Sequence, residues 1–483
     1  MGLVTPTEPV PLGQLGRVHF TGIGGAGMSG IARIMLARGV PVSGTDAAPS
    51  ALLDELAAAG AVVHVGHDAA HLAGADTLVV STAIRPGNPE LAAARQQGLR
   101  VLHRAGALAS VMLGKRTVAV AGTHGKTTTT SMLTTVLREL GADPSYVIGG
   151  ILAETGRGAD DGSGELFVAE ADESDGSFLM FAPEVAIVTC VEADHLDNYA
   201  GLAEIEAAFA EFAARISPGG LLVACADDPG ARALADAARD LPIRVRSYGE
   251  AADADYRISG IAPRGMTVGF QVSGGPEGPG GPDVAGSPAA QVLLAVPGRH
   301  NALNATAVLA TCAELGFPVD EVTLGLAAYR GARRRLEPKG EADGVRVLDS
   351  YAHHPTELAA DLTAGRDIAE GGRVIVIFQP HLFSRTKIFA TEFGTALGLA
   401  DEVLVLDVYP AREDPVPGVT GDLVAAAVPG GRARFLPDKT MAAAAVAATA
   451  KPGDLVLTMG AGDVTALGEP VLAALRTRGG PAG

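Results

Sequence analysis

The chain has 483 residues, which is too many for one hydrophobic core, and roughly 150 residues per domain predicts about three domains. Its apolar fraction of 47% is that of a globular protein, and no run of ~20 apolar residues is present that would span a bilayer. The formal net charge of −18 argues against nucleic acid or anionic lipid as a partner, because an acidic surface repels both.

Cysteine usage and the N-terminus predict a cytoplasmic protein. The cysteines, Cys190, Cys225 and Cys312, lie far apart without metal-ligand spacing, which predicts buried free thiols in a reducing compartment. The first residues, 1–15, are proline-rich and lack a basic region followed by an apolar run, so no signal peptide is expected.

Residues 1–114 are predicted to form a Rossmann-like domain around a parallel sheet. Strands are expected at 17–21, 41–45, 61–65 and 77–81, with a helix at 28–38. The turn between the first strand and the helix consists of Gly22, Ile23, Gly24, Gly25, Ala26 and Gly27. Asp46 ends the second strand, as in the dinucleotide fingerprint. The turn fits any diphosphate, and a purely structural turn is the alternative.

Residues 115–335 are predicted to form a central domain with a parallel sheet and a small antiparallel part. Fully apolar strands, typical of a sheet buried on both faces, are expected at 117–121, 166–169, 185–191 and 221–225. Antiparallel strands are expected at 256–261, 266–272 and 292–296, before a helix at 301–315. The stretch 273–288 is dense in glycine and proline and is interpreted as an extended hairpin insertion.

A loop for the phosphates of ATP is predicted directly after the strand at 117–121. It consists of Gly122, Thr123, His124, Gly125, Lys126 and Thr127, and a helix begins near Thr128. Glycines let the backbone wrap a phosphate, and the helix N-terminus offers N–H groups to it. Lys126 can reach the terminal phosphates, and the Thr127 hydroxyl can bind Mg²⁺. The loop is a shortened variant, because Val120 replaces a distal glycine.

An acidic metal partner is expected where a neighbouring strand ends beside this loop. Glu170 follows the apolar strand at 166–169 and is well placed for Mg²⁺. Glu173 and Asp175 come next and also fit a solvated acidic loop. His195 follows the strand at 185–191 among carboxylates, where a neutral imidazole fits a second metal ligand, with a core histidine as the alternative.

Residues 336–483 are predicted to form a third, Rossmann-like domain. Strands are expected at 345–348, 374–378, 403–406 and 455–458, with a helix at 441–450. Asp349, Tyr351 and His353 follow the first of these strands and Arg385 the second, at the edge where open α/β sheets place ligands. Because His353 and His354 are adjacent, they cannot both face one site, and one of them is expected to be structural.

An arginine run, 333–335, stands at the junction of the second and third domains. Such a run is often a solvated face. At a hinge beside an ATP site it can instead close on the γ-phosphate.

The motifs, taken in order, resemble those of the muramyl ligase family of peptidoglycan synthesis, over nearly the whole chain. The resemblance rests on the runs that begin at Gly22, Gly122, Glu170, Glu192, Pro297, Arg334, Tyr351 and Phe378. It implies three domains: an N-terminal Rossmann-like UDP-binding domain, a central P-loop domain and a C-terminal Rossmann-like domain that closes over the site. Within the family, the motifs are most similar to those of the branch that adds L-alanine.

The resemblance implies an ATP-dependent ligation. ATP would phosphorylate the lactyl carboxylate of UDP-N-acetylmuramate, and the amine of L-alanine would attack the resulting acyl phosphate. Mg²⁺ and Lys126 would offset the repulsion between the anionic groups. The expected partners are therefore these three substrates, and the chain is expected to be a monomer or a homodimer.

The resemblance also implies roles for individual residues. Residues from Gly122 to Thr128 would hold the ATP phosphates, with Thr127 and Glu170 as ligands of one Mg²⁺ and His195 as a ligand of a second. Asn301, Asp349 and Tyr351 resemble adenine or ribose contacts, and Arg335 the γ-phosphate contact. Arg385 and His353 would face the alanine or the UDP-sugar. The UDP-sugar site would contain Gly22, Gly24, Gly25, Ala26, Gly27, Met28, Asp46, His67, Ser81 and Thr82.

Three departures from the family pattern bear on these roles. Ser350 replaces an acid, which puts the nucleotide contact from that position in doubt, and Leu382 replaces an arginine, which leaves Arg385 to bind more of the carboxylate. Related ligases for other amino acids often use a carbamylated lysine. No lysine occurs between Lys126 and Lys339, which favours His195 as the ligand.

Alternative functions remain at this point. A related ligase could add a whole peptide during murein recycling, although the turn from Gly22 to Gly30 matches the alanine branch better. The same turn and Asp46 would also suit an NAD-dependent dehydrogenase, which leaves the phosphate loop unexplained. A non-catalytic nucleotide-binding module is the remaining alternative.

Overall fold

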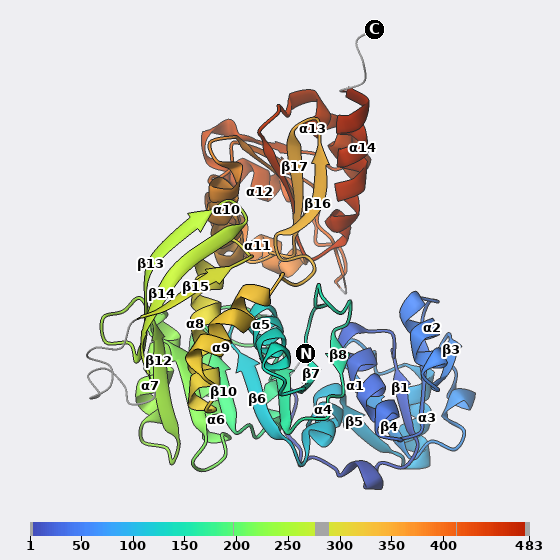
Figure 1. The fold of residues 1–483 in the computed structure, drawn as a ribbon. Helices are drawn as coiled ribbons and strands as arrows, with labels where there is room; N and C mark the ends of the chain where they lie inside the picture. Colours follow the sequence, from blue (N-terminus) through green and yellow to red (C-terminus); the bar gives the residue numbers. More distant parts are fainter. Residues whose placement is uncertain (1–2, 197, 276–288, 412, 479–483) are drawn as a thin grey trace. The chain divides into compact units, whose positions relative to one another are not determined.

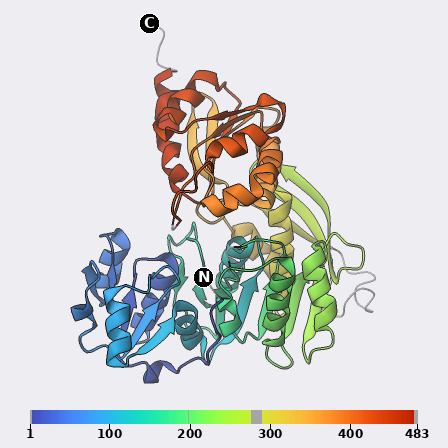
Figure 2. The same ribbon diagram turned by 180° about the vertical axis from the view of Figure 1, so that it is seen from behind.

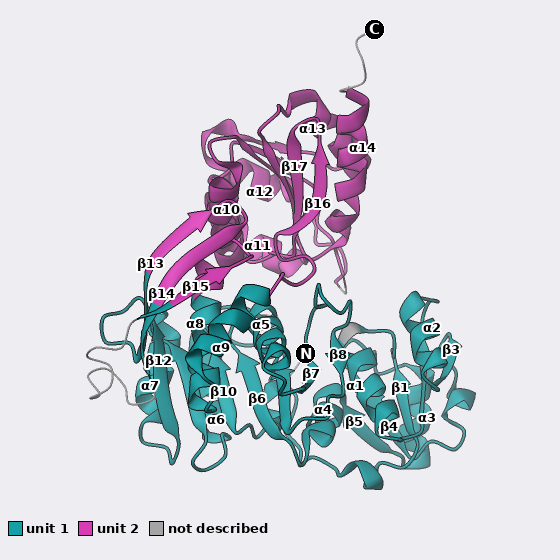
Figure 3. Cartoon of the chain, viewed as in Figure 1, with its two compact units in different colours: residues 1–259, 272–290, 303–328 teal, residues 260–271, 291–302, 329–483 magenta. Residues whose placement is uncertain are grey.

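The structure, a computed structural model, describes residues 3–196, 198–275, 289–411 and 413–478. It divides into two compact units (Figure 3). Unit 1 contains residues 1–259, 272–290 and 303–328, and unit 2 contains residues 260–271, 291–302 and 329–483. The sheets and helices of both units make the chain an α/β protein, as predicted (Figures 1 and 2). Most of the expected insertion, 276–288, lies outside the described residues, and the domain boundaries at 114 and 335 stay predictions.

The N-terminal sheet is parallel throughout, as the sequence predicted. Its order is β3-β2-β1-β4-β5, so β1 lies where the strand order reverses. Ligands of open α/β sheets bind at such a switch point, and the glycine turn follows β1 there. The elements are β1 (Val18–Thr21), α1 (Ala26–Ala37), β2 (Val42–Asp46), α2 (Ala51–Ala58), β3 (Val62–Val65), β4 (Thr77–Val80), α3 (Pro89–Gln97), β5 (Arg100–His103) and α4 (Arg104–Met112).

The central sheet has the order β15-β14-β13-β12-β11-β10-β6-β9-β7-β8 within the described residues. Its strands β6 (Arg116–Ala121), β9 (Leu166–Glu170), β10 (Val185–Val188), β11 (Leu221–Cys225) and β12 (Arg244–Gly249) are parallel. The parallel strands β6 and β9 are neighbours, so their carboxyl ends, Ala121 and Glu170, lie side by side. The helices of this part are α5 (Lys126–Glu139), α6 (Leu202–Ala214), α7 (Pro229–Ala238), α8 (Arg299–Glu314) and α9 (Val319–Ala328).

The remaining strands lie toward the two ends of this sheet. β13 (Tyr256–Arg264) and β14 (Thr267–Gly274) are joined by Gly265 and Met266 alone, a connection that only antiparallel neighbours allow. The structure adds β7 (Ser145–Val147) and β8 (Ala159–Asp160), which were not predicted, and places β15 at Ala290–Leu294.

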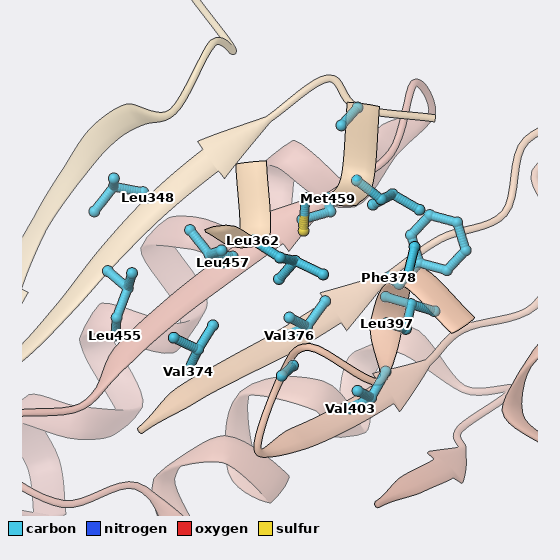
Figure 4. Close-up of a cluster of buried hydrophobic side chains, with 14 of the residues drawn as sticks. Leu348, Leu362, Val374, Val376, Phe378, Leu397, Val403, Leu455, Leu457 and Met459 are labelled. Carbon is cyan, nitrogen blue, oxygen red and sulfur yellow. The ribbon is translucent and has the colours of Figure 1, made fainter. Parts of the chain in front are cut away.

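The C-terminal sheet has the order β16-β17-β21-β18-β19-β20, with only the edge strand β16 antiparallel. Its middle strand β18 (Val374–Phe378) is buried over its whole length. Val374, Val376 and Phe378 pack into the cluster shown in Figure 4, and Ile375 and Ile377 pack into the cluster on the other face. Because alternate side chains of a strand point to opposite faces, an unbroken apolar run requires helices on both sides.

Those helices are present on both faces. Side chains of α10 (Pro355–Ala369), α11 (Phe383–Leu397) and α12 (Gly421–Ala427) belong to the first cluster, and those of α13 (Ala442–Thr449) and α14 (Gly468–Arg478) to the second. The remaining strands are β16 (Glu337–Ala342), β17 (Val345–Ser350), β19 (Glu402–Val405), β20 (Ala433–Phe435) and β21 (Leu455–Met459). Within the described residues, no helix is long and apolar enough to cross a membrane.

Candidate functional site

The phosphate loop connects β6 to α5 as predicted, and its backbone requires glycine at two positions. Gly122 has φ +128, and a Cβ there would overlap Thr189 Oγ1 and lie 2.9 Å from Thr189 N. Gly125 has φ +81 and is the N-cap of α5. L-residues rarely adopt such φ values. The loop therefore passes so close to its neighbours that a side chain at Gly122 would not fit.

Lys126 is held over this loop by the loop itself and by one carboxylate. Its Nζ donates to Gly122 O at 2.7 Å and to Glu173 Oε1 at 2.9 Å. Burial alone would lower the pKa of the Lys126 ammonium, but the charges of Glu173 and Asp172 outweigh burial and raise the pKa. The ammonium is thus fixed in its charged form at the position that a terminal phosphate would need.

Thr127 and Glu170 form the oxygen pair that the sequence analysis proposed for Mg²⁺. Thr127 Oγ1 donates to Glu170 Oε1 at 3.0 Å, and Gly149 N donates to Glu170 Oε2 at 2.7 Å. The pairing of β6 with β9 brings the two side chains together. A hydroxyl and a carboxylate beside a phosphate loop are the hard oxygen donors that Mg²⁺ prefers, so these residues fit the ion.

His195 lies in the same acidic group, in a left-handed backbone conformation with φ 53. Its Nε2 is 3.5 Å from Glu173 Oε1 and 3.6 Å from Asp194 Oδ2. Burial alone would lower the pKa of His195, but the hydrogen bond with Glu173 and the charge of Asp194 raise it. Strained backbone of this kind is typical of functional sites. As placed here, the imidazole pairs with Glu173, and a metal would require its neutral form.

Glu173 is the residue of this group that the sequence analysis undervalued. It was left open as part of a solvated acidic loop, yet its side chain is 2% exposed and pairs with both Lys126 and His195. The Tyr199 hydroxyl also donates to its carbonyl oxygen at 2.6 Å. Asp175 is buried as well. The solvated alternative is therefore wrong for both, and the only signal in the sequence was the acidic run itself.

The predicted UDP-sugar residues gather at the carboxyl edge of the N-terminal sheet. Gly22 N donates to Thr45 O at 2.8 Å, and Gly24 N donates to Asp46 Oδ2 at 2.9 Å, so Asp46 lies at the glycine turn. His67 Nδ1 lies 2.9 Å from Thr45 Oγ1. Ser81 and Thr82 directly follow β4 and are half-buried. Gly25 is the N-cap of α1, Ala26 and Gly27 are the first two residues of that helix, and Met28, the third, is buried.

The buried carboxylate of Glu90, in α3, is hydrogen-bonded to residues at the ends of two of these strands. It accepts hydrogen bonds from Thr21 Oγ1 at 2.7 Å and Thr45 Oγ1 at 2.9 Å, and His19 Nε2 lies 3.6 Å away. Burial alone would raise the pKa of Glu90, but His19, Thr21 and Thr45 together lower it to about 2. Glu90 was not a candidate in the sequence analysis, because nothing in its local pattern marks it.

In unit 2, two arginines flank the ring of Tyr351. The guanidinium carbons of Arg334 and Arg335 lie 4.8 Å and 5.4 Å from its centroid. Arg334 is anchored further, because its Nη2 donates to Gly460 O at 2.6 Å and its Nε donates to Asp349 Oδ2 at 3.2 Å. Arg335 Nη1 lies 4.0 Å from Glu357 Oε1, so each of these two arginines stands beside a carboxylate.

The other predicted residues of unit 2 differ in how they are placed. Asp349 is fully buried against Arg334, Thr458 and Thr465, so it presents no exposed atom to a nucleotide in this structure. His354 is the structural histidine of the adjacent pair, because its side chain caps α10 by accepting from Thr356 N. His353 Nδ1 lies 3.0 Å from Tyr351 O, on the arginine–tyrosine cluster.

Asn301 and Arg385 are both largely buried. Asn301 lies in α8, and its Nδ2 donates to Pro297 O at 2.6 Å. The helix α11 begins directly after Leu382, whose φ is 70, and Arg385 lies in its first turn. The phosphate loop belongs to unit 1, whereas Asn301 and Arg385 belong to unit 2.

Comparisons with known proteins match each of three successive parts of the chain to a model of the same family. A model described as Mur ligase family, catalytic domain, matches residues 17–116. The Mur ligase middle domain matches residues 120–312, and the Mur ligase glutamate ligase domain matches residues 334–462.

Curated relatives and solved structures agree with these matches. A UDP-N-acetylmuramate–L-alanine ligase of Thermobifida fusca is 56% identical, covering 98% of this chain and 100% of the relative. A UDP-N-acetylmuramate-alanine ligase of Thermotoga maritima has a TM-score of 0.79 at 28% identity, covering 95% of this chain and 99% of that one. A murein peptide ligase of Psychrobacter arcticus has a TM-score of 0.68 at 25% identity, covering 95% and 98%.

Proposed function

The chain belongs to the Mur ligase family, and we propose that it ligates L-alanine to the lactyl carboxylate of UDP-N-acetylmuramate at the expense of ATP. The observation that carries this proposal is the phosphate loop, in which Lys126 and the Thr127–Glu170 pair are already in position. The 56% identity to an alanine ligase supports alanine over a peptide as the added group.

In the proposed reaction, the loop from Gly122 to Thr128 holds the ATP phosphates. Lys126 exchanges its contact with Glu173 for the γ-phosphate, whose charge develops most strongly during transfer. Arg335 adds a second cation to the same phosphate when the third domain closes. The carboxylate of the sugar attacks the γ-phosphorus, ADP leaves, and the amine of alanine displaces phosphate from the acyl phosphate.

Thr127, Glu170 and His195 are the residues proposed to hold Mg²⁺. When bound, the ion supplies positive charge that reduces the repulsion between ATP and the sugar carboxylate. Glu170 is oriented for this by Gly149 N, and His195 is oriented by Glu173.

The remaining candidates are assigned to substrate binding. The turn at Gly22, Gly24, Gly25, Ala26 and Gly27, with Met28, Asp46, His67, Ser81 and Thr82, receives the UDP-sugar. Asn301 and Tyr351 contact the nucleoside of ATP, with Asp349 acting through Arg334. Arg385 and His353 face the alanine carboxylate or the sugar. We place the enzyme in the cytoplasm, where ATP is available and where its free cysteines would stay reduced.

A phosphate-release assay tests the substrate assignment. With ATP, Mg²⁺ and UDP-N-acetylmuramate, we expect phosphate release with L-alanine and weaker release with glycine or L-serine. Glycine lacks one methyl group, which discriminates by only ~1–3 kcal/mol, and a methyl-sized pocket rejects the added hydroxyl of serine only incompletely. Release with the murein tripeptide but not with alanine would favour the recycling ligase. Release without the UDP-sugar would contradict both.

A lysine substitution tests the phosphate loop. Lys126→Ala is expected to abolish ligation, whereas Lys451→Ala, at an exposed position in a loop of the C-terminal part, should leave it unchanged. Ligation retained in Lys126→Ala would contradict the mechanism, and a wild type that binds ATP without ligating would indicate a binding module.

A further inference from the structure

Arg104 is a cation at the glycine turn that neither the sequence motifs nor the proposed function uses. It follows β5 and is the first residue of α4. A Cβ built on Gly27 would lie 3.6 Å from Arg104 Nη1, which places one edge of the guanidinium beside the turn. Of the four glycines from Gly22 to Gly27, only Gly27 has a cationic atom among the nearest neighbours of such a Cβ.

The other edge of the guanidinium reaches the acidic group beside the phosphate loop. Arg104 Nη2 donates to Asp172 Oδ2 at 2.6 Å and lies 4.0 Å from Asp175 Oδ2. Asp172 is the second residue after Glu170. Both edges of Arg104 lie within unit 1, so this residue connects the proposed UDP-sugar turn with the proposed ATP site.

The guanidinium has donors to spare. Among the described residues, the recorded hydrogen bond of Arg104 is the one from Nη2 to Asp172. The side chain is 26% exposed, and its Nη1 is the atom nearest to a Cβ built on Gly27. Nη1 carries two N–H donors, and a guanidinium that stays charged is well suited to phosphate oxygens.

We propose that Arg104 binds the diphosphate of the UDP-sugar through its Nη1 group while Nη2 stays on Asp172. This inference rests on the proposed function and adds a substrate-binding residue to it. The charge balance supports it, because Glu170, Asp172, Glu173 and Asp175 would repel a diphosphate brought to Gly27 unless a cation stood between.

A second interpretation is that the ion pair only joins the two parts of unit 1. The variants Arg104→Gln and Asp172→Asn separate the two interpretations, because both break the pair but only the first removes the guanidinium. Arg100→Gln, at the start of the preceding strand β5 and with an exposed side chain, is the matched control.

The experiment is isothermal titration of the full-length chain with UDP and with UDP-N-acetylmuramate, without ATP. We expect Arg104→Gln to weaken both Kd values by about 10- to 100-fold, the effect of a lost hydrogen bond to a charged group. Arg104→Lys should restore part of the loss, and Asp172→Asn and Arg100→Gln should bind as the wild type does.

Equal losses in Arg104→Gln and Asp172→Asn would overturn the inference in favour of a joining role, as would an unchanged Kd in Arg104→Gln. If Arg104→Gln does not fold, unweakened binding by Asp172→Asn still supports the inference, and weakened binding opposes it. A failure of the proposed function would look different, because the wild type itself would then bind neither UDP nor UDP-N-acetylmuramate.

Discussion

The pairing of Lys126 with Glu173 makes a quantitative prediction about the ATP-free protein. The variant Glu173→Gln keeps the shape of the side chain but removes the charge opposite a lysine that is only 13% exposed. Removing one partner of a buried ion pair costs about 3–5 kcal/mol. Because Lys126 keeps its hydrogen bonds to Gly122 O and Thr123 O, we expect the lower end, about 3 kcal/mol.

ATP should reverse much of this loss, since its phosphates bring a new partner to Lys126. In a domain of ~200 residues, 1 kcal/mol shifts Tm by about 2–4 °C, so the ATP-free variant should melt ~6–12 °C below the wild type. With saturating ATP and Mg²⁺ the difference in Tm between the two proteins should narrow. The phosphates then pair with Lys126 in the variant, and a bound ligand stabilises the folded state.

Differential scanning calorimetry with and without ATP measures both effects. The control is Glu184→Gln, whose pair with Arg116 has side chains 37% and 47% exposed, so its loss should cost no more than ~1 kcal/mol. Equal melting temperatures for the two variants would refute the claim that Glu173 compensates Lys126. A gap that ATP leaves unchanged would refute the claim that the phosphates replace Glu173.

Three further predictions concern other parts of the molecule. The pKa of Glu90 is about 2 in the folded state against 4.5 for a free carboxyl, which corresponds to about 3 kcal/mol of stability. This contribution should be present above about pH 4.5 and lost as the pH falls toward 2. The free energies of unfolding in urea of the wild type and of Glu90→Gln should therefore converge in acid. Gly122→Ala should weaken ATP binding at least ~100-fold, measured by titration, while Gly87→Ala, with open space around it, should not. Phe378→Ala in the C-terminal core should cost about 3–5 kcal/mol in urea unfolding, against less than ~1 kcal/mol for Ile388→Ala, which is 49% exposed.

The strands that the sequence analysis placed best are those that are apolar along their whole length. Leu221–Cys225 and Val374–Phe378 were predicted to the residue, because burial on both faces leaves an unbroken apolar run. The strand expected at 185–191 ends instead at Val188, and the hydroxyl of the next residue, Thr189, donates to His124 O in the phosphate loop. Arg100–His103 was missed because a short strand with polar ends carries no such run.

The same distinction applies to the candidate site. Lys126, Thr127 and Glu170 were identified because each stands at a fixed offset from a strand end, and the parallel pairing of β6 with β9 then brings them together. Glu173 and Arg104 depend on tertiary packing. An acidic run looks solvated until its burial is known, and Arg104 becomes significant only because α4 brings it beside Gly27.

Three cations near the proposed substrate sites are paired with carboxylates. Lys126 is held by Glu173, Arg104 by Asp172, and Arg334 by Asp349. This pairing places the cations before any substrate arrives, and it also means that an anionic substrate must compete with a carboxylate or share its cation. In a chain with a net charge of −18, the proposed binding of ATP should therefore depend on added positive charge. The proposed Mg²⁺ ligands, Thr127 and Glu170, stand where that charge is needed most.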